Sequence, residues 1–193
     1  GTPEGQDVTC NGAGDGEATI ELQNASNPVT YEWANGETTS TITGLTPGTY
    51  SVTATDNNNC PITADVTISE PQALAANATS TNETEAGAKD GTATATPTGG
   101  TGNYTYDWSN GETTQMIENL APGEYTVVIT DENGCTALNS YEVSQPDELQ
   151  ISLTAQHVTC YGENNGTATA TFSGGTGLVS YKWSNGAQGE TIE

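Results

Sequence analysis

The sequence YTYDWSNGETTQMIENLAPGEYTVVIT at residues 104–130 decides the fold of this chain. Nearly the same stretch, VTYEWANGETTSTITGLTPGTYSVTAT, occurs at residues 29–55, and a third copy begins at Val179 as VSYKWSNGAQGETIE. The tryptophans of the three copies recur every 75 residues, as 108 minus 33 and 183 minus 108 show: Trp33, Trp108 and Trp183. A fixed period of this length indicates a tandem repeat, so every residue is interpreted by its place in the repeat.

Two prolines mark the predicted boundaries of the repeats. Proline cannot donate a hydrogen bond to a β-ladder and it stiffens a linker, so Pro71 and Pro146 end the first two copies. We name residues 1–71 the first repeat, 72–146 the second, and 147–193 the third, which is truncated before its last strands. Linkers this short predict a rod-like array of semi-rigid units.

Apolar residues alternate with period two within each repeat, as at Ala93 and Ala95 or at Val127 and Ile129. Gly, Pro and Asn-Gly pairs separate these runs, and no stretch has a helical period. The pattern predicts an all-β chain of tandem β-sandwiches of immunoglobulin or fibronectin type III character. The Asn-Gly pairs predict tight hairpins in which both central residues have positive φ.

Tyr and Trp lie two residues apart in the YEW, YDW and YKW sequences, so both side chains point to one face of a strand. We interpret Trp33, Trp108 and Trp183 as structural core residues. The alternative is an aromatic platform for sugar rings, which requires exposed rings. The Leu-x-Pro-Gly-x-Tyr segments that end at Tyr50 and Tyr125 have the layout of a tyrosine corner, which locks the crossover between two sheets.

The charge of the chain is strongly unbalanced. It has 25 acidic residues against two lysines, for a net charge of -23. Nucleic acid and anionic membrane surfaces are therefore excluded as partners, because both need a basic face. No apolar run approaches the roughly 18 residues that span a bilayer, so no membrane insertion is expected, and Gly1 opens no signal peptide, which is expected of a mature or excised fragment.

Acidic turns are the weak candidates for a metal site. Hard oxygen ligands could hold calcium, which the negative charge favours, at four turn aspartates: Asp15, Asp56, Asp90 and Asp131. Asp and Asn also occur in turns simply because they bond their own backbone, and we favour this structural reading. No other cofactor is expected.

The four cysteines occupy two positions of the repeat. Cys10 and Cys160 share the first position, Cys60 and Cys135 share the second, and Glu85 stands at the first position in the second repeat. Pairing Cys10 with Cys60, or Cys135 with Cys160, sets another cysteine against Glu85. Pairing Cys10 with Cys135, between successive repeats, leaves no mismatch and is our favoured hypothesis. Free thiols are the alternative, and they are unusual in exported proteins.

No catalytic constellation stands out from the repeat. Nucleophilic triads need a histidine or an equivalent base, and His157 has no counterpart in the first two repeats. An array that repeats its scaffold is expected to be mechanical or adhesive and not an enzyme.

Several of these segments together resemble the SprB repeat: the glycine loop before Tyr-x-Tyr-x-Trp-Ser-Asn-Gly, the Leu-x-Pro-Gly-x-Tyr-x-Val entry and Asp-x-Asn-Gly-Cys at residues 131–135. The resemblance implies part of a very large cell-surface adhesin of gliding bacteria, exported by the type IX secretion system and carried by the gliding machinery. It supplies no catalytic residue. Glu85 and the NASN sequence at residues 24–27 depart from the pattern.

The leading hypothesis is therefore an extracellular, cell-surface segment that extends from the cell and bears load in adhesion and gliding. Its expected partners are further repeats of the same chain and an external surface or polysaccharide, and the gliding and secretion machinery is contacted elsewhere in the full protein. A glycan-binding accessory module of a secreted protein and a calcium-stiffened extracellular linker array are the alternatives.

Overall fold

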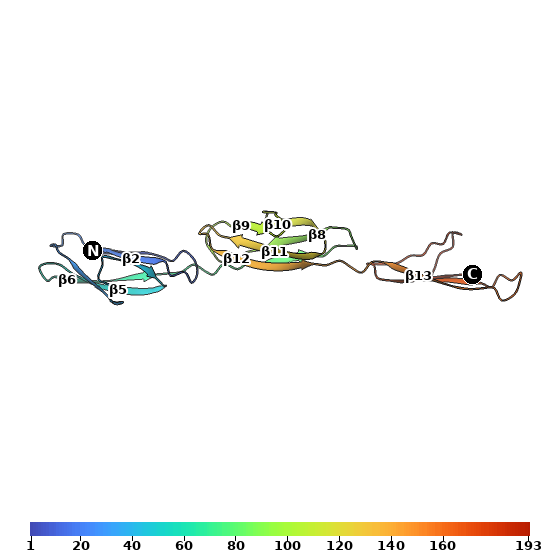
Figure 1. The fold of residues 1–193 in the computed structure, drawn as a ribbon, viewed down its shortest axis with the longest axis horizontal. Coiled ribbons are helices and arrows are strands. Elements are labelled where there is room, and N and C mark those ends of the chain that lie inside the picture. Colours follow the sequence, from blue (N-terminus) through green and yellow to red (C-terminus); the bar gives the residue numbers. More distant parts are fainter. The chain divides into compact units, whose positions relative to one another are not determined.

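The computed structural model describes residues 1–193, which form strands and turns without a helix (Figure 1). There is thus no helix that could cross a membrane. The strands are β1 (Thr2–Gln6), β2 (Gly16–Glu21), β3 (Thr30–Trp33), β4 (Thr41–Leu45), β5 (Gly48–Thr55), β6 (Pro61–Ile68), β7 (Ala78–Thr81), β8 (Gly91–Ala95), β9 (Thr105–Trp108), β10 (Met116–Leu120), β11 (Gly123–Thr130), β12 (Thr136–Val143), β13 (Gln150–Gln156), β14 (Thr167–Ser173) and β15 (Thr191–Ile192).

Two compact units make up the chain, and each is described by itself. The first unit comprises Gly1–Asn77, Ala95–Gln115 and Thr126–Asn139. The second unit comprises Ala78–Thr94, Met116–Tyr125 and Ser140–Glu193. The predicted boundaries at Pro71 and Pro146 stay a prediction.

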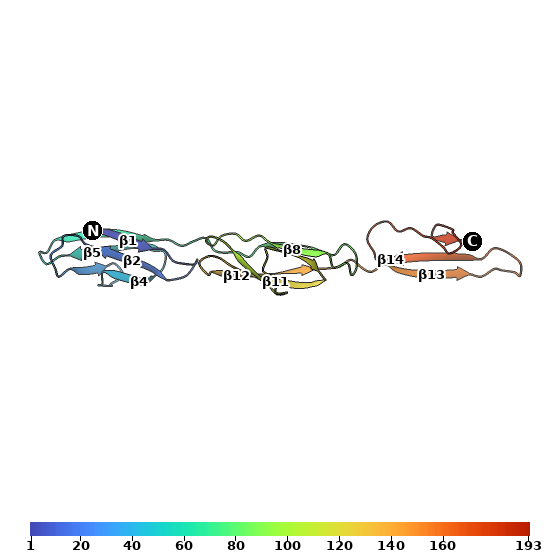
Figure 2. The ribbon, with the colours of Figure 1, turned by 90° about the horizontal axis from the view of Figure 1, so that it is seen from above.

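The first repeat is an antiparallel sandwich of two three-stranded sheets, ordered β1-β2-β4 and β3-β5-β6. Figure 2 shows β1, β2 and β4 side by side. Immunoglobulin domains divide their strands between two sheets in the same way, with the third, sixth and seventh strands of their usual order together in one sheet. The predicted all-β, immunoglobulin-like fold class is confirmed.

The core of the first repeat lies between these two sheets. Alternate residues of β2 are buried, with Ala18 at 0% and Ile20 at 1% exposure, because successive side chains of a strand point to opposite faces. Trp33 is 2% exposed, and its indole Nε1–H donates to the carbonyl of Thr39 at 2.8 Å. The remaining core residues are Val8, Ile42, Leu45, Val52, Ala54, Val66 and Ile68.

The strands of the second repeat pair in the same order, as sheets β10-β8-β7 and β12-β11-β9. Trp108 is also 2% exposed, and its Nε1–H donates to the carbonyl of Thr114 at 2.9 Å. The residues one period after the core of the first repeat are buried as well: Ala93, Ala95, Ile117, Leu120, Val127, Ile129 and Val143.

The prediction for the Asn-Gly hairpins was wrong, because β3 and β4 lie in different sheets, as do β9 and β10, and the backbone of the turn also differs. Gly36 and Gly111 have positive φ, of 90° and 86°, but neither Asn35 nor Asn110 does. The amide of Gly111 donates to the carbonyl of Trp108 at 2.8 Å, so the asparagine is a central residue of the turn and the glycine its last residue. Only the glycine therefore needs the left-handed conformation, as in a turn that ends in a bulge.

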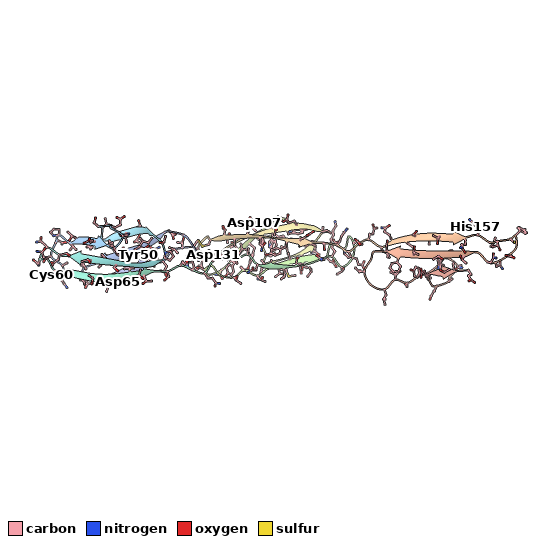
Figure 3. The ribbon with its side chains drawn as sticks, turned by 90° about the horizontal axis from the view of Figure 1, so that it is seen from below. Tyr50, Cys60, Asp65, Asp107, Asp131 and His157 are labelled. Atoms are coloured by element: carbon pink, nitrogen blue, oxygen red, sulfur yellow. A yellow bond between two sulfur atoms is a disulfide. The ribbon has the colours of Figure 1, made fainter.

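Tyr50 and Tyr125 each fasten the turn that leads into their strand. The phenol of Tyr50, labelled in Figure 3, donates to the carbonyl of Thr46 at 2.9 Å. The phenol of Tyr125 donates to the carbonyl of Ala121 at 3.0 Å. Each bond spans four residues across the Pro-Gly turn, which is the geometry of a tyrosine corner.

The third repeat is a single sheet, ordered β13-β14-β15, in which β13 and β14 lie side by side (Figure 2). Trp183 is half-buried, unlike Trp33 and Trp108, and donates to the carbonyl of Gly189 at 2.9 Å. Ile151 is 67% and Leu153 64% exposed. Residues 147–193 have no counterparts of β5 and β6, so the prediction of Trp183 as a core residue does not hold here.

Removing the hydroxyl group of Tyr125 should lower the free energy of unfolding of the second repeat. Tyr125→Phe leaves the carbonyl of Ala121 without its donor, and the net value of one such bond predicts a loss of about 1 kcal/mol. Chemical denaturation followed by tryptophan fluorescence measures the loss. Tyr161→Phe is the control, because Tyr161 is fully exposed. Equal midpoints for the two variants would show that the corner does not stabilise the repeat.

Candidate functional site at the junctions between repeats

The linker that enters the second repeat lies against its glycine loop. The amide of Gly100 donates to the carbonyl of Gln72 at 2.8 Å, and the amide of Ala75 donates to the carbonyl of Thr98 at 2.9 Å. A Cβ on Gly99 would lie 2.0 Å from the carbonyl oxygen of Ala73, and φ at Gly99 is 71°. Only glycine therefore lets the two backbones approach this closely.

The same contact recurs at the start of the third repeat. The amide of Gly175 donates to the carbonyl of Asp147 at 2.7 Å, and a Cβ on Gly174 would lie 2.2 Å from the carbonyl oxygen of Glu148. The sequence singled out the glycine loop without assigning it a role. Its recurrence after each proline boundary, where an incoming linker must be held, was the available signal.

The turn that presents Cys135 is organised by the carboxylate of Asp131. Its Oδ1 accepts from the amides of Asn133 at 3.0 Å and Cys135 at 2.9 Å, and its Oδ2 accepts from the amide of Thr101 at 2.8 Å. Asp131 is only 5% exposed, and it lies at the end of β11 (Figure 3). A buried carboxylate needs such donors, so the turn and its charge stabilise each other.

The turn that presents Cys10 is fixed on both sides. The carboxylate of Asp15 accepts from the amide of Thr9 at 3.0 Å and from its hydroxyl at 2.5 Å. The amide of Gly12 donates to the carboxylate of Glu70 at 2.9 Å, and the side chain of Asn11 donates to the carbonyl of Pro71 at 3.1 Å. Cys10 is thus held against the end of its own repeat, where the linker begins.

Cys10 and Cys135 form a disulfide, with 5.7 Å between their Cα atoms. This is the pairing that the repeat register favoured. Beside it, the side-chain amide of Asn133 donates to the carbonyl of Thr9 at 2.9 Å. The first turn of one repeat and the last hairpin of the next are therefore joined by a covalent bond and a hydrogen bond. Cys60 and Cys160 are exposed free thiols.

The junction between the second and third repeats has Glu85 where the first has Cys10. Its turn is held from inside by Glu83, which is 4% exposed and accepts from the amides of Gly87 at 2.9 Å and Lys89 at 2.8 Å. The hydroxyl of Thr176 donates to the carbonyl of Thr84 at 3.2 Å. A cleft at this junction gathers three acidic side chains, which repel one another: Glu85, Asp147 and Glu148.

The four calcium candidates lie in separate turns, and the structure contains no group of three or more His, Cys, Asp or Glu side chains that could hold a metal. Their oxygens accept hydrogen bonds from their own turns and, at Asp56 and Asp131, also from the amides of Ser26 and Thr101. The hydroxyl and then the amide of Thr9 hold the pKa of Asp15 below its usual value, and Thr84 does the same for Asp90. The amide of Cys60 is the largest cause of the lowered pKa of Asp56.

A family model of the SprB repeat matches residues 3–38, 77–113 and 152–188, which is more than half of the chain. The chain belongs to the SprB repeat family. Each match covers the early strands and the Trp-x-Asn-Gly turn of one repeat. No curated protein matches the chain.

Several solved structures with immunoglobulin domains are similar to these SprB repeats. The four N-terminal Ig domains of Dscam1 isoform 9.44 are 13% identical over 67% of this chain and 40% of that chain, with a TM-score of 0.33. A C-terminal fragment of intimin, solved with the intimin-binding domain of its receptor, is 17% identical over 78% and 66%, with a TM-score of 0.41. Murine CEACAM1b is 15% identical over 68% and 92%, with a TM-score of 0.31. At these scores the likenesses carry no further argument, and the chain spans less than half of the Dscam1 fragment.

Removing the disulfide should destabilise the SprB repeats that it joins. A double variant, Cys10→Ser with Cys135→Ser, should lose about 2–5 kcal/mol, because the bond closes a loop of 125 residues and restricts the unfolded chain. Urea denaturation measures the loss. The matched control, Cys60→Ser with Cys160→Ser, removes two exposed thiols and should unfold like the wild type. Similar losses in both double variants would contradict a stabilising role for the bond.

The substitution Asp90→Asn should change how the melting temperature depends on pH. The pKa of Asp90 is lowered from 3.8 in the folded state, so its carboxylate stabilises the fold above that pH, and this stabilisation is lost as the pH falls through the folded pKa. Asn165 occupies the same position in the third repeat and still accepts from the amide of Thr159 at 3.0 Å, so the variant keeps the turn. The variant should melt below the wild type at pH 7 and together with it at pH 2.

Melting curves across this pH range, followed by circular dichroism, test the expectation for Asp90. Asp107→Asn is the control for the loss of one charge, because Asp107 is exposed on β9 and shares no hydrogen bond with a turn (Figure 3). A gap between Asp90→Asn and the wild type that is the same at every pH would contradict the role of the ionised carboxylate.

Proposed function

We propose that this chain is a load-bearing segment of a long cell-surface adhesin that acts in surface adhesion and gliding motility. The SprB family supports an adhesin-type repeat module that is part of a larger multi-repeat protein. The disulfide supports an extracellular location, since such bonds persist in oxidising compartments. In this proposal the type IX secretion system exports the protein, the gliding machinery carries it, and contact with an external surface or polysaccharide is made elsewhere in the full protein.

The disulfide between Cys10 and Cys135 is the main support for this proposal, because it gives tension a covalent path. Force applied before Cys10 and after Cys135 passes from one sulfur to the other, so the residues between them are shielded from it. Strands β2 to β11 lie within this loop, together with most of the cores around Trp33 and Trp108, whereas β1 and β12 lie outside it. A covalent bypass around two folded cores suits a segment that is pulled, because a covalent bond does not yield to forces that break hydrogen bonds.

The composition supports an exposed place on a cell. A net charge of -23 keeps long molecules soluble and apart. Lys89 and Lys182 are the only basic residues, so trypsin-like proteases have few sites in this sequence.

An accessory glycan-binding module is less well supported. An aromatic platform needs exposed rings, but Trp33 and Trp108 are each 2% exposed, and their indole groups donate to the backbone carbonyls of Thr39 and Thr114. Trp33 and Trp108 therefore support the fold of the first two SprB repeats and offer no flat surface to a sugar.

Single-molecule stretching of the chain by its two ends tests the load-bearing proposal. With the disulfide intact, the fully extended chain should be shorter by about 400 Å, because 125 residues at about 3.3–3.6 Å each stay inside the closed loop. Adding a reductant should release this length in every molecule. The double variant Cys10→Ser with Cys135→Ser should show the full length from the start.

The matched control for the stretching experiment is the double variant Cys60→Ser with Cys160→Ser, which keeps the bypass and should extend like the wild type. Equal lengths with and without reductant would contradict the proposed load path.

A further inference from the structure

Cys60 and Cys160 occupy the two repeat positions that Cys135 and Cys10 occupy in the disulfide between the first two SprB repeats. Cys60 lies 75 residues before Cys135, and Cys160 lies 150 residues after Cys10. Both thiols are exposed and unpaired, whereas their counterparts are bonded to each other. Cys60 is therefore the equivalent of Cys135, and Cys160 is the equivalent of Cys10.

The hairpin around Cys60 already has the conformation of the hairpin around Cys135. The carboxylate of Asp56 accepts from the amides of Asn58 at 2.9 Å, Cys60 at 3.0 Å and Ser26 at 3.3 Å. These are the positions, one period earlier, of the three amides that bond to Asp131. Cys60 lies at the hairpin between β5 and β6, as Figure 3 shows.

The turn around Cys160 likewise has the conformation of the turn around Cys10. The amide of Thr159 donates to Asn165 at 3.0 Å, as the amide of Thr9 donates to Asp15. The amide of Glu163 donates to the carbonyl of Cys160 at 3.2 Å, as the amide three residues after Cys10 donates to the carbonyl of Cys10. The hydrogen bonds to the backbone of each turn therefore match those of its bonded counterpart, while the side-chain amide of Asn58 donates to the hydroxyl of Ser26 at 2.8 Å.

We propose that the surfaces around Cys60 and Cys160 are complementary docking sites for another SprB repeat, and that each forms a disulfide with it. The Cys60 surface takes the first-turn cysteine of a partner repeat, and the Cys160 surface takes the hairpin cysteine. A second copy of this chain carries both, so Cys60 of one copy pairs with Cys160 of the next. Asn58 then donates to the carbonyl of Thr159 in the partner copy, as Asn133 donates to that of Thr9. This inference does not depend on the load-bearing proposal.

The bond forms by thiol–disulfide exchange with a small-molecule disulfide. The thiolate of one cysteine attacks a sulfur of oxidised glutathione and releases one glutathione thiolate. The second cysteine thiolate then attacks the mixed disulfide and releases the other. The two protein thiols lose two protons and two electrons, and the oxidised glutathione is reduced to two thiols.

Two single variants test the direction of pairing. Cys60→Ser keeps only the thiol of Cys160, and Cys160→Ser keeps only that of Cys60; both retain the disulfide of the first junction. Each is incubated alone, and the two are incubated together, with oxidised glutathione. Salt at about 1 M shortens the Debye length to about 3 Å, which removes most of the repulsion between two copies of charge -23. Non-reducing electrophoresis and mass spectrometry of the linked peptides measure the products.

The mixture should form disulfide dimers at least about tenfold faster than either variant alone, and the linked peptides should join Cys60 to Cys160. Adding Asn58→Ala to the Cys160→Ser variant should slow the mixed reaction several-fold. Equal rates for the mixture and for the separate variants would overturn the proposal, because random collisions of exposed thiols show no preference. Wild-type chains that close a Cys60–Cys160 bond within one copy would overturn it as well.

Discussion

The disulfide between Cys10 and Cys135 is the constraint on which the joined repeats depend. Immunoglobulin domains of antibodies have their disulfide inside one sandwich, beside the buried tryptophan. Here the tryptophan is likewise buried in the core of the sandwich, but the disulfide joins the first turn of one repeat to the last hairpin of the next. A loop of roughly this length is worth about 4–5 kcal/mol, several times the value of a single hydrogen bond. A small core is thus supported by its neighbour.

Carboxylates position the turns on both sides of this bond. The carboxylate of Asp131 accepts hydrogen bonds from backbone amides around Cys135. The carboxylate of Asp15 accepts from the amide and the hydroxyl of Thr9, beside Cys10. The same residue types in the same turns would also suit calcium, and composition alone does not separate the two uses. In the structure the carboxylate of Asp131 accepts three hydrogen bonds from backbone amides, which is the structural use.

Much of the fold could be predicted because one pattern occurs three times. The alternation around Ala93 and the tyrosine corner at Tyr125 depend on local sequence, so they could be read directly. The pairing of Cys10 with Cys135 could be favoured because each of the other two pairings leaves a cysteine opposite Glu85. The role of Gly99 could not be predicted, since it depends on where the linker lies in space. The prediction of positive φ for the asparagines of the Asn-Gly turns was wrong, because Asn-Gly fits more than one type of turn.

Glu83 explains how the second repeat forms the same turn without its cysteine. The first repeat has Val8 at this position, 3% exposed, and a carboxylate there would be costly if it lacked donors. Glu83 finds them in two amides of its own turn, so the turn is fixed from within and needs no partner. A junction with cysteine is therefore covalent, whereas the junction with Glu85 relies on hydrogen bonds such as that of Thr176 and adds repulsion between carboxylates. Under the proposed load, hydrogen bonds would yield before a disulfide, so we expect a junction with Glu85 to give way before a junction with cysteine.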